Sequence, residues 1–311
     1  MKKFILILSF LLPLSLILSA CTNGKNQSKE KKEQLNVYTT VFPLQYFTEQ
    51  IGGKYVNVKT VYPPGADEHT FEPSQKDMMN LADSDLFFYI GLGLEGFVEK
   101  TKDTLKDEDV ELVPTAEHLK LPKDTHSEED GEDHGSSDIN PHVWLDPVYS
   151  KEMAAVIRDH LISKMPQNKD FFNKNYEKLA SELDDLNNRY QQTISKAKHK
   201  KMMVTHAAFG YWETRYGLEQ ISISGLSTTN EPTQKQLEKI ISTAEHEGIH
   251  YVLFEQNVQS KLGKVVQQEM GAKALPIHNL AILSKENLKH KETYFTLMDA
   301  NLKTLETALN N

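Results

Sequence analysis

Four histidines carry the most specific chemical signal in this sequence, because each stands where one predicted element ends and the next begins. They are His69, His142, His206 and His278. Neutral imidazole is a preferred ligand of Zn²⁺ and similar borderline metals, which usually bind four ligands in a tetrahedron. One histidine at such a boundary is typical of an ordinary surface position, but four in the same context predict a common metal site.

The turn around His69 indicates how such a ligand is held still. Residues Tyr55–Tyr62 alternate in pattern and are rich in β-branched and aromatic side chains, which predicts a strand. Pro63 and Pro64 then fix the backbone, and Gly65 permits a conformation that bulkier residues resist. His69 therefore follows the carboxyl end of a strand, the edge at which α/β sheets usually bind ligands.

A second histidine pattern competes with this interpretation. The run His246-Glu247-Gly248-Ile249-His250 matches H-E-x-x-H, the signature of zinc metallopeptidases. That chemistry needs both histidines on one face of one continuous helix. Here the helix predicted from Pro232 should end at Gly248, and a strand-like run follows directly. We therefore expect the two histidines to point in unrelated directions.

The order of elements predicts an α/β fold of two similar lobes. Strand-like and helix-like segments alternate through both halves, which is typical of parallel strands joined by crossover helices. The predicted strands are residues 35–42, 55–62, 86–90 and 110–113, then 201–208, 218–224, 250–256 and 273–277. We assign residues 35–165 to the first lobe and 199–311 to the second, with the metal site in the cleft between them.

A long helix is predicted to bridge the lobes. Apolar residues recur every three or four positions between Asp170 and Ser195, and at about 1.5 Å per residue this segment would be nearly 40 Å long. We assign residues 166–198 to this linking helix. It is either a rigid spine that limits lobe motion or an ordinary core helix, and the periodicity fits both.

The first 34 residues have the pattern of a lipoprotein leader. Lys2 and Lys3 precede an apolar run that ends in Leu-Ser-Ala before Cys21, the only cysteine, so residues 1–20 are predicted to be a signal peptide. This arrangement resembles the lipobox of bacterial lipoproteins, which implies lipidation of Cys21. The residues that follow are polar, lysine-rich and without periodicity, so we assign residues 21–34 to the lipidated cysteine and a flexible tether. Without a free thiol, a metal site must use nitrogen and oxygen ligands.

Charge narrows the possible partners. The net charge of −9 makes nucleic acid an improbable partner. Residues 123–138 form an acidic insert that carries His126 and His134 but no apolar residue, which predicts a loop without a packed core. The insert is either a solvated linker or a weak collector of divalent cations.

Four motifs, in order, resemble the metal-binding lipoproteins of bacterial ABC importers, the cluster A-I family with its ZnuA/AdcA-like zinc group. They are PGADEHTFEP from residue 64, NPHVWLDP from residue 140, THAAFGY from residue 205 and STTNEPT from residue 227. The resemblance extends from Leu35 to the C-terminus. It implies a rigid two-lobed binding protein with a spanning helix, and metal ligands at His69, His142 and His206.

The fourth ligand is where this sequence departs from the family pattern. Relatives often supply a carboxylate from the last strand-to-helix loop, where this chain has Ala281. Our candidate is His278, with Glu68 or a water molecule as alternatives. Asp146 and Glu255 are expected to be supporting carboxylates, since such groups often orient a ligating imidazole.

The resemblance implies a function in zinc uptake. We expect a lipid-anchored monomer on the outer face of the bacterial membrane, which is not an enzyme and passes Zn²⁺ to an ABC permease driven by a cytoplasmic ATPase. Manganese relatives carry glutamate at the position of His206, so zinc is the implied cargo. A manganese or mixed-metal importer component is the nearer alternative, and a zinc-dependent surface adhesin or a metallopeptidase is more distant.

Overall fold

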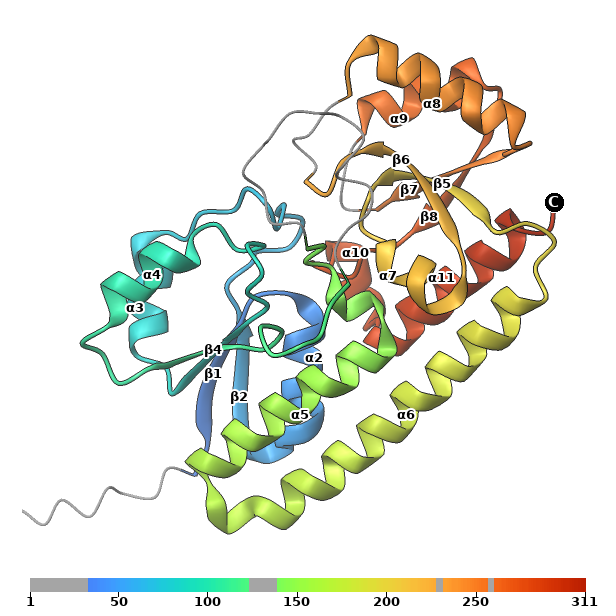
Figure 1. The fold of residues 1–311 in the computed structure, drawn as a ribbon. Coiled ribbons are helices and arrows are strands. Elements are labelled where there is room, and N and C mark those ends of the chain that lie inside the picture. The colour runs from blue at the N-terminus through green and yellow to red at the C-terminus, as the bar shows by residue number, and fades with distance from the viewer. Residues whose placement is uncertain (1–32, 123–138, 228–231, 257–259) are drawn as a thin grey trace, which may run out of the picture. The chain divides into compact units, whose positions relative to one another are not determined.

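The computed structural model describes residues 33–122, 139–227, 232–256 and 260–311 (Figure 1). Residues Gln34–Asn311 form one compact unit. The predicted signal peptide, Cys21 and the acidic insert with His126 and His134 lie outside the described residues. None of the helices in the described ranges is long and apolar enough to cross a membrane.

The first lobe is built on a parallel four-stranded sheet with the order β2-β1-β3-β4. Strand β3 is buried along its whole length, as expected for the interior of a parallel sheet covered on both faces. The strands are β1 (Leu35–Thr39), β2 (Val56–Thr60), β3 (Leu86–Tyr89) and β4 (Glu111–Pro114). The helices are α2 (Phe42–Gly52), η1 (Gly53–Tyr55), α3 (Gln75–Ala82) and α4 (Val98–Leu105).

The second lobe repeats this topology with the order β6-β5-β7-β8, also parallel. Its strands are β5 (Lys201–His206), β6 (Glu219–Ser224), β7 (Tyr251–Glu255) and β8 (Lys273–Ile277). Its helices are α7 (Gly210–Tyr216), α8 (Gln234–His246), α9 (Lys261–Glu269), α10 (Lys285–His290) and α11 (Tyr294–Ala308). In both sheets the first strand in sequence lies between the second and the third, so the prediction of two similar α/β lobes is confirmed.

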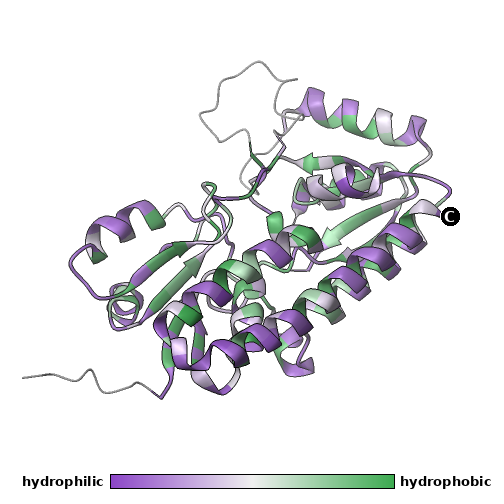
Figure 2. Cartoon of the chain, turned by 60° about the horizontal axis from the view of Figure 1, so that its bottom comes forward, coloured by the Kyte–Doolittle hydropathy of each residue, from purple (hydrophilic) through white to green (hydrophobic). Residues whose placement is uncertain are grey.

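Helices between the sheets support both lobes. The segment η3 (Val143–Leu145) leads into α5 (Pro147–Lys164), and η4 (Pro166–Asn168) leads into the 27-residue helix α6 (Lys169–Ser195). Helix α6 packs against α2 and α5, which precede it in the sequence, and against α7 and α11, which follow it (Figure 1). Its outward face is hydrophilic (Figure 2). Its buried stripe contains Phe172, Leu179, Leu183, Leu186, Tyr190 and Ile194.

One hydrophobic core runs through both lobes. It includes Phe47 from α2, Trp144 from η3, Trp212 from α7 and Tyr294 from α11, all of which are fully buried. A second, smaller core lies within the second lobe, where α8 and α9 cover its sheet. The two lobes are therefore joined by shared packing as well as by the chain.

Hydrogen bonds reinforce this junction along a seam, which we define as residues 140–146 together with α7 and the residues just before it. Tyr211 donates from its hydroxyl to the carbonyl of Asn140 (2.5 Å), and Trp212 Nε1 donates to the carbonyl of Leu145 (2.8 Å). Arg215 pairs with Asp146 at 2.7 Å. Asp146 also caps α5 by accepting from the Val148 N–H, so its contacts are structural.

The buried carboxyl of Glu95 joins the ends of two strands in the first lobe. Its oxygens accept hydrogen bonds from the Thr40 hydroxyl (2.7 Å) and from the backbone N–H groups of Ile90 (2.8 Å) and Gly91 (3.1 Å). Burial raises the pKa of Glu95 from 4.5 to about 7, against these hydrogen bonds, which lower it. The folded protein therefore holds a proton on Glu95 in a pH range where the unfolded chain has released it.

The stability of the protein should consequently depend on pH through Glu95. Between pH 4.5 and about 7 the folded state binds the extra proton, so the contribution of Glu95 to the free energy of unfolding is present at low pH and is lost as the pH rises toward 7. The full change is about 3 kcal/mol at most. Urea unfolding at several pH values, on wild type and Glu95→Gln, should show a shallower slope in the variant, which keeps only the contribution of groups such as Glu68.

The exposed Glu99 in α4 offers a matched control, since its partner Lys102 lies at the surface. Glu99→Gln should keep the pH dependence of the wild type. Equal slopes for wild type and Glu95→Gln would contradict the assignment.

Candidate metal centre

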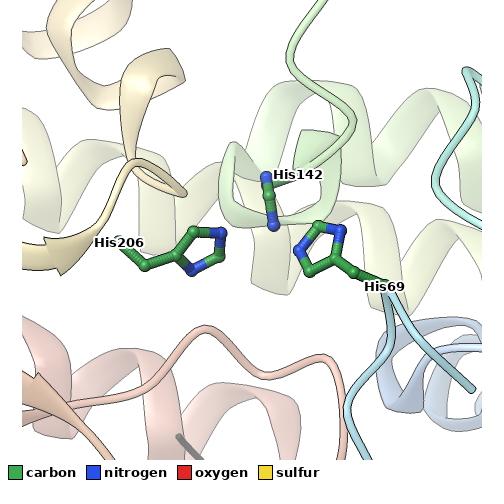
Figure 3. A group of neighbouring side chains, drawn as sticks. All are labelled: His69, His142 and His206. Carbon is green, nitrogen blue, oxygen red and sulfur yellow. The ribbon is translucent and has the colours of Figure 1, made fainter. Parts of the chain in front are cut away.

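Three of the predicted histidines meet at one point. His69, His142 and His206 each offer a ring nitrogen, and these nitrogens all lie within 4.8 Å of one another. Figure 3 shows the three rings turned toward a common centre from three separate segments. The ring centroids are 4.8 Å apart for His142 and His206, and 5.2 and 5.4 Å from His69 to those two.

His69 is carried by the loop between β2 and α3. The Asp67 side chain accepts hydrogen bonds from the N–H groups of His69 (2.9 Å) and Thr70 (3.2 Å), which forms a tight turn at the tip of the loop. The Tyr62 hydroxyl donates to the carbonyl of Glu68 at 3.3 Å. The Nε2 atom of His69 is buried and has no hydrogen-bond partner among the described residues.

His142 is fully buried at the start of η3, and its neighbour Asn140 fixes its protonation. Asn140 Nδ2 donates to the carbonyl of Ala207 at 3.2 Å, so Oδ1 is the accepting end of that amide. Oδ1 accepts from the backbone N–H of His142 (3.0 Å) and lies 2.8 Å from its Nδ1. Nδ1 therefore carries the proton and Nε2 keeps a lone pair, which no group in the described chain contacts through a hydrogen bond.

His206 ends β5 and is oriented by the neighbouring strand β7. Its Nδ1 lies 2.9 Å from Oε1 of Glu255, and this carboxylate oxygen accepts a hydrogen bond from the Nδ1–H group. Its Nε2 lies 2.9 Å from the carbonyl of Leu226. The contact between His206 and Glu255 is the carboxylate–imidazole pair expected from the sequence, an arrangement that orients metal-binding histidines.

Burial and mutual repulsion favour neutral imidazoles at two of the three positions. Burial lowers the pKa of His142 well below 6.5, and the neighbouring His206 and His69 lower it further. Burial and His206 likewise lower the pKa of His69 to about 4. Burial also lowers the pKa of His206, but the charge of Glu255 and its hydrogen bond outweigh burial and raise this pKa to about 9. A metal ion at His206 therefore replaces a proton.

The donor set suits zinc. Three imidazole nitrogens without a thiolate form a set that Zn²⁺ accepts readily, with one tetrahedral position left over. Nε2 of His69 and Nε2 of His142 are buried without a hydrogen-bond partner in the described residues, and the His142 atom is a lone-pair acceptor. A buried acceptor of that kind costs stability unless it is satisfied, and a cation satisfies it.

The structure does not bring the candidate fourth ligands into this group. Among the described residues, the cluster of potential ligands contains neither His278 nor Glu68. The backbone of His278 is held by the Asn301 side chain through two hydrogen bonds of 2.8 Å. Glu68 Oε1 lies 4.0 Å from Nε2 of His69, and burial raises the pKa of Glu68 to about 7.

The H-E-x-x-H motif is not arranged as in a metallopeptidase. His246 is the last residue of α8, and Glu247 caps that helix. Gly248 then takes the left-handed conformation with φ +66°, and His250 lies beyond it, before β7. The two histidines therefore do not share a helix. This agrees with the helix end predicted at Gly248.

Three residues that shape the centre were not predicted as such. Asn140 and Leu226 contact His142 and His206, and Asn279 contacts Glu68. For Asn140 a local signal exists, because an asparagine side chain often accepts a hydrogen bond from the backbone N–H two residues later, here that of His142. The other two contacts join segments far apart in the sequence and have no local signal.

Comparison with known proteins identifies similar chains over nearly the full length. A family model described as ZnuA, the periplasmic component A of a zinc-uptake complex, matches residues 37–308. The zinc-binding lipoprotein AdcA of Streptococcus pneumoniae R6 is 34% identical over 98% of this chain and 61% of its own length. The high-affinity zinc uptake system protein ZnuA of Bacillus subtilis 168 is 31% identical over 94% of both chains.

A solved structure shares the fold. The crystal structure of Zn(II)-bound AdcA from Streptococcus pneumoniae superposes with a TM-score of 0.76 and 32% identity, over 89% of this chain and 58% of that one. This chain thus matches 61% of the length of the pneumococcal protein. The two parallel-sheet lobes and the long helix are features of the matched fold.

Proposed function

Because this chain belongs to the ZnuA family of zinc-uptake complex components, we propose that it is the extracytoplasmic Zn²⁺-binding component of an ABC importer. It would capture the ion at His69, His142 and His206 and pass it to a membrane permease driven by a cytoplasmic ATPase. Zinc is the cargo of this protein, and the family is one of transport components rather than of enzymes.

The observation that carries the proposal is the convergence of two buried imidazoles and one half-buried imidazole, two of which have an unpartnered Nε2 in the described structure. Nitrogen donors favour Zn²⁺, whereas Mn²⁺ is better served by carboxylates. This donor set therefore supports zinc over the manganese alternative. The zinc-binding names of the pneumococcal and Bacillus relatives support the same cargo.

We further propose that the protein acts as a monomer on the outer face of the membrane, held there by a lipid on Cys21. The leader sequence supports this location, and the pneumococcal relative is named as a lipoprotein. A lipid anchor would keep the binding unit beside its permease.

Uptake of zinc by the bacterium that encodes this chain tests the proposal directly. In medium with limiting zinc, cells without the gene should lose most of their radioactive zinc uptake, and the wild-type gene should restore it. A gene that encodes His206→Ala should not restore uptake, because the ion loses one of its three nitrogen ligands. Normal zinc uptake in cells without the gene would contradict a role in import.

A further inference from the structure

Asn279, in the loop between β8 and α10, is held in a single orientation. It is buried, and its Oδ1 accepts from the N–H of Ala281 at 3.0 Å. Its own carbonyl accepts from Trp144 Nε1 at 2.6 Å. Because the Ala281 N–H can only donate, the amide oxygen must face it and Nδ2 must face the other way. Leu280, with φ +62°, takes the left-handed conformation in the tight turn between them.

The fixed Nδ2 of Asn279 points at Glu68, a carboxylate beside the three histidines. It donates to Oε1 of Glu68 at 2.8 Å, and Glu68 is itself only 2 % exposed. The same oxygen lies 4.0 Å from Nε2 of His69. Two ligand atoms that share a tetrahedral zinc ion at about 2.1 Å are about 3.4 Å apart. The nitrogens of the three histidines are themselves up to 4.8 Å apart, so the 4.0 Å distance to His69 places Glu68 beside the site. The oxygen of Glu68 that lies near His69 is the one that the Asn279 amide occupies.

We propose that Asn279 is a positioning residue that sets the metal preference of this centre by holding the Glu68 carboxylate off the bound ion. The inference rests on the proposed zinc-binding function and adds to it the residue that decides the fourth coordination position. With Glu68 held, the chain supplies three nitrogens and the remaining position is left to water.

Removing this restraint should change which metal the centre prefers. A Glu68 carboxylate without its donor would be buried beside a cation, and a rotation of its side chain would bring an oxygen onto the ion. Every divalent ion gains from the added negative charge, but a hard ion such as Mn²⁺ gains more than Zn²⁺ from an oxygen ligand. The bond between Asn279 and Glu68 therefore raises the preference for zinc.

The test is the ratio of the Mn²⁺ to the Zn²⁺ dissociation constant, measured by competition titration on the purified protein. Asn279→Ala is expected to lower this ratio by about tenfold. The same substitution in a Glu68→Gln background should leave the ratio of that background unchanged, because no carboxylate remains to be released. Asn279→Ser is a second variant, since its hydroxyl can still accept from Ala281 but is too short to reach Glu68.

Asn301 provides the matched control. It is a buried asparagine whose side chain bonds both backbone groups of His278 in the same loop, and Glu68 is not among its partners. Asn301→Ala also removes buried hydrogen bonds to this loop but leaves the bond between Asn279 and Glu68, so it should keep the wild-type ratio. Circular dichroism verifies that each variant is folded.

Two results would overturn the inference. One is an unchanged ratio in the folded Asn279 variants, and the other is an equal fall in Asn301→Ala. Either result would leave the zinc-binding function intact if wild type binds Zn²⁺ tightly and the loss of a histidine ligand abolishes that binding. Failure of wild type to bind Zn²⁺ would instead remove the proposed function.

Discussion

Replacing His142 with alanine should weaken zinc binding by about 100-fold or more. Four-ligand zinc sites have apparent binding free energies of roughly 10–16 kcal/mol, so one ligand contributes about 3 kcal/mol. His142 is buried, and Asn140 holds it with its lone pair on the nitrogen that faces the centre. Its loss therefore removes a ligand that needs no rearrangement. Competition of the protein with a zinc chelator measures the change.

His246 is the control for this experiment. It lies exposed at the end of α8, outside the group of three histidines, so His246→Ala should bind zinc as wild type does. The opposite pattern, with His246→Ala impaired and His142→Ala normal, would place the metal at the H-E-x-x-H motif. Peptide hydrolysis would then be the activity to assay.

Truncating Trp212 to alanine should destabilise the whole folded unit by about 4 kcal/mol, the usual cost of removing a buried aromatic side chain. Trp212 has 0 % of its surface exposed, and its ring contacts Phe209 and Tyr190 with centroids 4.7 and 5.4 Å apart. It also donates across the seam to Leu145. The two lobes should therefore lose stability together. Urea unfolding followed by circular dichroism and by Trp144 fluorescence should give coincident, shifted transitions.

Trp212→Phe separates the hydrogen bond from the packing. It keeps an aromatic ring but leaves the carbonyl of Leu145 without its donor, which should cost about 1–2 kcal/mol. If Trp212→Ala unfolded only the second lobe, with Trp144 still in its native environment, the idea of a core shared by both lobes would be wrong.

The strands could be predicted from short runs of apolar and β-branched residues, which are fully buried in β3 but largely exposed in β8. Leu86–Tyr89 is apolar throughout, and the predicted bounds of β8 match the structure. Strand ends were less accurate. Residues 35–42 were predicted as one strand, but β1 ends at Thr39 and α2 begins at Phe42. Val41 and Phe42 are buried by the packing of the helix start, and a buried apolar residue has the same appearance in sequence whichever element holds it.

The site was predictable only in part, for a similar reason. Histidines at element boundaries, together with a known family pattern, gave the three residues that converge, and their role as ligands remains a prediction. The fourth position depends on which way a side chain points. His278 follows a predicted strand as well as His69 does, yet Asn301 from α11 fixes its backbone outside the group. No local pattern encodes a contact between residues 23 positions apart.

The seam has a consequence for how long an ion stays bound. It ties the segment that carries His142 to the lobe that carries His206, through Asn140 and Ala207, so the segments with those two histidines share one packed core. In the described chain, the loop that carries His69 is held mainly by its own lobe, through hydrogen bonds at Asp67 and Tyr62 and ring contacts of Phe71, whereas Asn279 provides a hydrogen bond from the second lobe. Local opening of weakly tethered loops is far less costly than global unfolding. We therefore expect opening of this loop to set the residence time of the ion, so that a transport partner that pulled on the loop could empty the centre without separating the lobes.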